Sequence, residues 1–270
     1  MKKYMAYPLL ALLGGTAAFF LRFLQMKTGF EADTGLPVAG NLYARLLPLL
    51  FAVLALLFLL LVRKLPVEKA ETSLSFSHYF FTAGAALPSL LVTGLFLLLA
   101  SGAYDLYAGL LLNRSVLELI LGILSIFCAA FLFPVVSACR KQPGKPSRKT
   151  PPSGNLLLAP VLLLVIRLVL TYRADSINPS LSAYYVEILA LSFLLLGFYR
   201  LSSFAFHSGN TRRFALYAMM SLVFTLATLA DGHGVSAQLL YCGCVLLQLA
   251  FLLLRFSALI WMETPTGAED

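Results

Sequence analysis

The stretch YFFTAGAALPSLLVTGLFLLLASGAY (Tyr79–Tyr104) contains no charged residue and lies between His78 and Asp105. It is longer than the about 20 apolar residues that an α-helix needs to cross a bilayer. The run is continuous and rich in leucine, whereas the strands of a membrane barrel alternate apolar and polar side chains. The stretch therefore predicts a transmembrane helix rather than a strand.

The same pattern recurs along the whole chain. Of the 270 residues, 60% are hydrophobic and only 12% are charged, against about 25% charged in typical soluble domains, and the mean hydropathy is +0.88. Soluble and disordered classes are thereby excluded. We expect an all-α integral membrane protein with eight transmembrane helices, at residues 6–24, 43–62, 79–100, 115–137, 155–172, 184–201, 213–230 and 236–261.

Lysine and arginine are distributed unevenly between the loops that this pattern creates. Thirteen of the 20 basic residues fall on one set of loops and five on the other, while Arg167 and Arg255 lie within spans. Because basic residues accumulate on cytoplasmic loops, both termini are predicted to be cytoplasmic. We expect a multi-pass protein of the plasma membrane, of bacterial origin. The net charge of +8 is then a signal of topology, so the expected partner is the lipid bilayer and not a nucleic acid.

A basic, proline-rich segment at residues 139–154 separates the first four spans from the last four. We interpret it as a cytoplasmic linker between a four-helix bundle at residues 1–138 and a second one at 155–270. Both halves have an arginine near the outer end of their first span, Arg22 and Arg167, followed by Ala-Asp and then a proline. This order suggests a parallel tandem repeat of four plus four spans. Chance similarity between leucine-rich sequences is the alternative.

Ionisable residues within spans point to function, since they are costly there unless they are paired or hydrated. Arg167 lies inside the fifth span and Glu187 at the start of the sixth. We expect both to face the interior and to line an outward-opening polar cavity, with Arg22 contributing from the first span. A guanidinium suits a carboxylate or phosphate, so a small anionic ligand is one prediction. Structural ion pairing would use the same groups and stays open.

Further charged residues belong to the predicted outer half. Arg114 and Glu118 are four residues apart, which predicts a local ion pair on one helix. An alternative for Arg22, Arg45 and Arg173 is that they extend to the lipid headgroups. The possible acidic partners on this side are Glu31, Asp33, Asp105, Glu118, Asp175, Glu187 and Asp231.

Histidine and cysteine do not form a metal-binding pattern. His78 and His207 are predicted on the cytoplasmic side and His233 in an outer loop, so the three cannot share one metal ion. Cys242 and Cys244 point to different sides of their helix, and the cysteines are expected to be packing residues. We therefore expect no metal and no cofactor. No nucleophile with its base is found on one side, which makes an enzyme the least favoured class.

Two function classes follow from these observations. The first is a small transporter or translocator with a polar, outward-facing site between the two four-helix halves. The second is a non-enzymatic membrane sensor, an assembly factor or a partner subunit of a membrane complex, which the short loops and the small number of intramembrane charges favour. A membrane protein partner is expected only for the second class.

Overall fold

The computed structural model describes residues 2–31, 36–66, 76–81, 86–112, 115–139, 154–175 and 181–263. Within these ranges the chain is mainly helical and has no named strand, and an isolated bridge joins Phe30 and Pro37. The all-α prediction is confirmed for this part of the chain. The elements are α1 (Lys2–Thr28), α2 (Leu42–Val62), α3 (Phe76–Tyr79), α4 (Ala86–Tyr107), η1 (Ala108–Leu112), α5 (Val116–Ala138), η2 (Gly154–Leu158), α6 (Ala159–Asp175), α7 (Leu181–Ala205), α8 (Thr211–Thr228), η3 (Leu229–Asp231) and α9 (Val235–Glu263).

Eight of the helices in the described ranges are long and apolar enough to cross a membrane. Each of them overlaps one of the eight predicted spans. Eight apolar helices of this length are typical of a polytopic membrane protein. Residues 79–81 of the predicted third span lie outside α4, and aromatic side chains among them pack against other helices. Phe80 is fully buried and meets Phe204 and Phe214 edge to face, with ring centroids 5.1 and 5.7 Å away. This contact holds α3 against the bundle as a separate turn.

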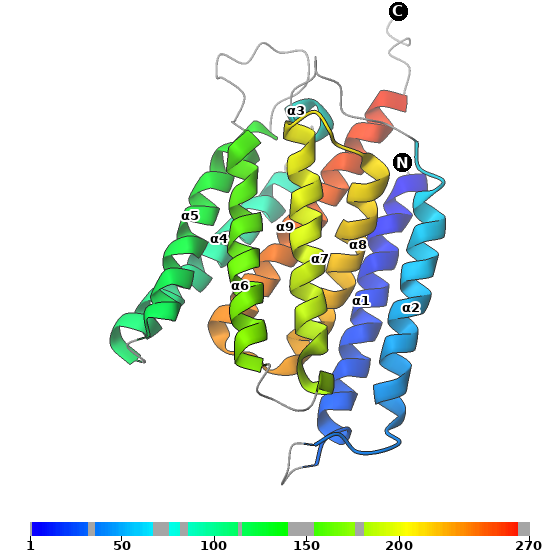
Figure 1. The fold of residues 1–270 in the computed structure, drawn as a ribbon. Helices are drawn as coiled ribbons and strands as arrows, with labels where there is room; N and C mark the ends of the chain where they lie inside the picture. Colours follow the sequence, from blue (N-terminus) through cyan, green and yellow to red (C-terminus); the bar gives the residue numbers. More distant parts are fainter. Residues whose placement is uncertain are drawn as a thin grey trace, which may run out of the picture.

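Figure 1 shows the helices side by side in an elongated array. The first residue of α1 and the last residue of α9 lie at the same end, which we call the terminal end. The opposite end, where α1 finishes at Thr28 and α9 begins at Val235, is the distal end. An even number of spans returns the chain to the side on which it started.

The helices α8 and α9 form the centre of this array. About 67% and 72% of their spans are buried, against 28% for α2 and 22% for the span that includes α6. The most extensive packing joins α4 to α9, α7 to α8, α4 to α5 and α1 to α8. The α1–α2 and α4–α5 pairs therefore lie on either side of α8 and α9 (Figure 1).

The division into a first four-helix bundle at residues 1–138 and a second at 155–270 stays a prediction. In the described ranges, the two sets of spans interlock through the contacts of α8 and α9 with helices of the first set. Hydropathy does not reveal such neighbours, because a leucine that faces lipid looks the same as one that faces a helix. Most of the linker at 139–154 lies outside the described residues, and the tandem repeat stays a prediction.

Glycine permits the close contact between α4 and α5. A Cβ atom added to Gly122 would lie 2.8 Å from the carbonyl oxygen of Gly102, and one added to Gly102 would lie 2.8 Å from that of Gly122. Small residues of this kind let transmembrane helices approach closely.

We expect Gly122→Val to force these helices apart and to lower the free energy of unfolding by about 1–3 kcal/mol or more. Reversible unfolding in mixed micelles measures the change. Gly234→Val is the matched control, since a Cβ at Gly234 has nothing within 4 Å. Equal stability of the two variants would contradict the close-contact role of Gly122.

The cysteines behave as packing residues in the described structure. Cys128, Cys139 and Cys244 are buried, and Cys242 is half-buried. Burial raises the pKa of the Cys139 thiol, at the end of α5, to about 12. That thiol therefore stays neutral at physiological pH, which suits a small apolar side chain better than a nucleophile.

Candidate functional site

Arg22 of α1 is fully buried although it carries a charge. Its Nε donates a hydrogen bond to Oδ1 of Asp231 in η3, and its Nη1 donates to Oε1 of Gln25 over 3.1 Å. The guanidinium carbon also lies 5.6 Å from the ring centroid of Tyr185 on α7. The expectation that Arg22 extends to the lipid headgroups is therefore wrong. Because α1 packs against α8 and against η3, the turn that follows α8, the carboxylate of Asp231 lies beside Arg22.

A tight turn places Asp231 and His233 together. Gly232 between them has a φ of +70°, a backbone conformation that glycine adopts without steric cost. The hydroxyl of Thr228 donates to Oδ2 of Asp231 over 3.0 Å and lies 3.3 Å from Nε2 of His233. The side chains of Asp231 and His233 are 5% and 17% exposed, so both face the helices rather than open solvent.

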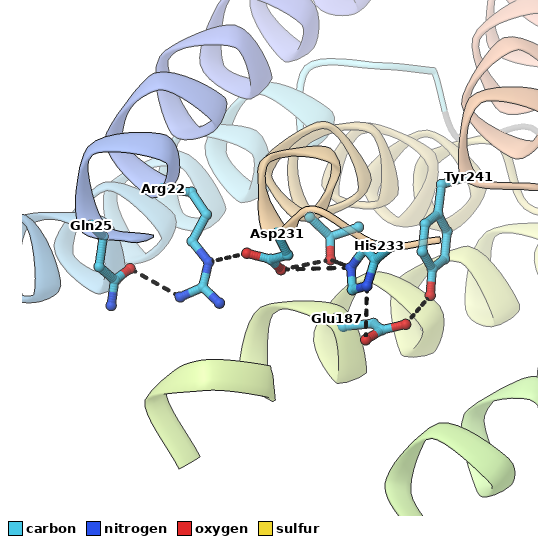
Figure 2. Close-up of polar contacts among 7 residues, drawn as sticks. Arg22, Gln25, Glu187, Asp231, His233 and Tyr241 are labelled. Carbon is cyan, nitrogen blue, oxygen red and sulfur yellow. Dashed lines mark hydrogen bonds and ion pairs between the residues drawn. The ribbon is translucent and has the colours of Figure 1, made fainter. Parts of the chain in front are cut away.

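The imidazole of His233 lies between two carboxylates, as Figure 2 shows. Nδ1 is 3.7 Å from Oε2 of Glu187, and Nε2 is 3.8 Å from Oδ2 of Asp231. These distances suit ion pairs but exceed those of ordinary hydrogen bonds. Histidine is the side chain that gains or loses its charge within the physiological pH range. A proton on His233 would therefore be attracted to both carboxylates at once.

Glu187 of α7 is buried and continues this chain of polar groups towards α9. Its Oε1 accepts a hydrogen bond from the hydroxyl of Tyr241, a fully buried residue of α9. The rings of Tyr241 and His233 meet edge to face, with their centroids 5.6 Å apart. Glu187 thus contacts two other elements, the turn after α8 and the first half of α9 (Figure 2).

Arg167 of α6 approaches the same tyrosine from another side. It is half-buried, and it interacts electrostatically with Tyr241 and with Asp105 of α4. Its Nε has no hydrogen-bonding partner among the described residues. The two residues expected to share one site, Arg167 and Glu187, are therefore joined through the Tyr241 hydroxyl. A ligand-binding role for them stays a prediction.

The remaining candidates lie at the edge of this cluster. Glu118 of α5 is half-buried and interacts electrostatically with Asp105. Arg114 lies outside the described residues, so its local ion pair with Glu118 stays a prediction. Arg45 and Arg173 are exposed, which agrees with a position at the headgroups.

We call the six residues labelled in Figure 2 the distal polar chain. They come from α1, α7, η3 with its following turn, and α9. They include four groups that can bind a proton, namely two carboxylates, an imidazole and a phenol. The described residues contain no set of three or more histidine, cysteine, aspartate or glutamate side chains that could hold a metal ion. The residues of the chain are Arg22, Gln25, Glu187, Asp231, His233 and Tyr241.

The sequence identifies only part of this chain. Arg22 and Glu187 are charges within predicted spans, and no prediction covers Gln25 or Tyr241. Asp231 is one of several possible acidic partners, and His233 is predicted in an outer loop. The run Ala-Asp-Gly-His-Gly directly after a span is the signal that could have identified them, since glycine on both sides of a histidine permits a turn back towards the helices.

The chain matches no protein-family model, and no curated protein or solved structure shows significant similarity to it.

Proposed function

We propose that the protein is a small transporter or translocator that takes up a proton at His233, between Glu187 and Asp231. The observation that carries this proposal is the position of the imidazole, 3.7 and 3.8 Å from two buried carboxylates. Chains of aspartate, glutamate and histidine at membrane depth are typical of proton relays in pumps and transporters.

The balance of charge favours a proton over an anion as the ligand of this site. The guanidinium group of Arg22 already donates hydrogen bonds to Asp231 and Gln25, so it does not have its full set of N–H donors available for a carboxylate or phosphate ligand. An additional anion near Glu187 and Asp231 would be repelled, whereas a proton on His233 is attracted to both. Arg167 is the remaining group for a small anionic ligand, since its Nε is unpartnered among the described residues.

We further propose that the distal end faces the outside of the plasma membrane and that both termini lie in the cytoplasm, as expected for a bacterial multi-pass protein. The distribution of basic residues supports this orientation, with thirteen on the loops of the terminal end and five on the distal side. The site then opens outwards between the two sets of four spans, with Arg22 from the first set and Asp231, His233 and Glu187 from the second.

The test is proton flux into proteoliposomes that enclose a pH-sensitive dye. The vesicles are diluted into acidic buffer, with and without the low-molecular-mass fraction of a cell extract as a source of substrates. We expect the wild-type protein to acidify the lumen faster than protein-free vesicles do. His233→Gln should slow this flux by at least about tenfold, because glutamine cannot carry the proton.

His207→Gln is the matched control, since His207 is exposed at the terminal end, after α7, and should keep the wild-type flux. If the wild-type protein is no faster than empty vesicles in either buffer, transport is the wrong class. The sensor, assembly-factor or partner-subunit alternative then gains support, and cross-linking in native membranes would look for the partner.

A further inference from the structure

A stripe of polar residues runs along one face of α9 through the middle of the bundle. Tyr241, Gln248 and Arg255 are seven residues apart and fully buried. Residues at this spacing lie on nearly the same face of an α-helix, with a drift of about 20° per step. From Tyr241 to Arg255 the helix rises by about 21 Å, most of the about 30 Å of a bilayer core.

Gln248 is the central residue of this stripe. Neither its Nε2 nor its Oε1 has a hydrogen-bonding partner among the described residues. Gly197 of α7 lies opposite, and a Cβ atom there would be only 2.7 Å from Nε2 of Gln248. The missing side chain at Gly197 thus provides the space that the carboxamide occupies. A buried amide within a membrane needs a partner for its donor and its acceptor.

The helix α8 provides two further buried polar residues beside α9. Thr211 and Thr225 are fourteen residues apart, two steps of seven along one face, and both are fully buried. At the terminal end, Oγ1 of Thr211 lies 3.0 and 2.8 Å from Nε and Nη2 of Arg255, which both donate to it. Further along the same face, Oγ1 of Thr225 has no hydrogen-bonding partner among the described residues. The face of α8 that meets Arg255 therefore has a second polar group nearer the distal end.

We infer that the Gln248 carboxamide binds water at the middle of the membrane and continues the distal polar chain to Arg255 and Thr211 at the terminal end. The steps from Tyr241 to Gln248 and from Gln248 to Arg255 each rise by about 10 Å, too far for direct hydrogen bonds but suited to a few bridging waters. This inference deepens the proposed function by giving the proton a path, and it rests on that function. Its test measures hydration rather than flux, so the two proposals fail separately.

The experiment places a single thiol at position 248 and follows its exchange with D2O. The four native cysteines are replaced by alanine, Gln248→Cys is introduced, and the S–H stretching band is recorded by infrared spectroscopy in lipid bilayers. We expect S–H to convert to S–D at least about tenfold faster than in the control, because exchange requires contact with water. The control is Leu247→Cys, which replaces a fully buried residue on the side of α9 that faces Gly94.

Equally slow exchange in Gln248→Cys and Leu247→Cys would overturn the inference, since the midplane site would then be dry. If Gln248→Cys fails to fold, Thr225→Cys in the same background replaces it, because cysteine is close to threonine in size. Fast exchange at position 225 supports the water path, and exchange as slow as at position 247 overturns it.

Discussion

Replacing Arg22 by alanine is expected to lower the free energy of unfolding by about 3–5 kcal/mol, because it leaves a buried carboxylate without its cation. The Asp231 side chain is only 5% exposed. Without Arg22, this carboxylate keeps the hydrogen bond that the neutral Thr228 hydroxyl donates over 3.0 Å. Gln25 also loses the donor that its Oε1 accepts from. Reversible unfolding in mixed micelles measures the effect.

Two further variants show whether the loss comes from the buried pair. Lys27→Ala removes an exposed cation from the last turn of the same helix, where Nζ lies 4.4 Å from the ring centroid of Phe23. This change should lower the free energy of unfolding by less than about 1 kcal/mol. The double variant Arg22→Met with Asp231→Leu should be more stable than Arg22→Ala, since it leaves no charge unpaired. A loss in Arg22→Ala no larger than that in Lys27→Ala would mean that Arg22 and Asp231 are solvated in the membrane.

Replacing Glu187 by glutamine is expected to reduce proton flux by about a hundredfold, the scale on which a positioned acid or base acts. The carboxylate is the acceptor for Tyr241 and the partner of Nδ1 of His233. Glutamine keeps the size and most of the hydrogen bonding of this side chain but removes the negative charge. A proton on His233 then loses one of its two attractive partners. The flux into dye-loaded proteoliposomes is the measurement.

Tyr241→Phe separates the charge of Glu187 from its positioning. The phenylalanine removes the hydroxyl that donates to Oε1 and keeps the ring that meets His233. We expect a smaller loss of flux than in Glu187→Gln, because the carboxylate remains. If Tyr241→Phe were as severe as Glu187→Gln, the hydroxyl itself would be an obligatory carrier of the proton. Full flux in Glu187→Gln would contradict the role of the carboxylate.

Hydropathy predicted the spans well but not their neighbours. Each of the eight predicted spans overlaps a long apolar helix of the structure. A transmembrane helix can be recognised from the length and hydropathy of a run such as Tyr79–Tyr104, because these two properties decide whether it can cross the bilayer. The predicted third span includes Phe80, which is apolar in sequence but lies outside α4 and packs against Phe204 and Phe214. The central position of α8 and α9 depends on interlocking shapes such as the contact between Gly94 and Gly243, which no hydropathy pattern contains.

The candidate site was predictable where a charge falls inside a span. Arg22, Arg167 and Glu187 could be identified from the sequence, because an ionisable group at membrane depth is costly without a partner. Which group becomes the partner depends on packing. Asp231 reaches Arg22 only because α1 lies along α8, and His233 reaches Glu187 only because of the turn at Gly232.

The most direct test is a double-variant cycle on proton flux that combines His233→Gln with Glu187→Gln. If one proton site lies between Glu187 and Asp231, the two changes remove the same step, so we expect the double variant to be no slower than the slower of the two single variants. Losses that multiply in the double variant would show that His233 and Glu187 act at separate sites, and they would contradict a proton site between Glu187 and Asp231.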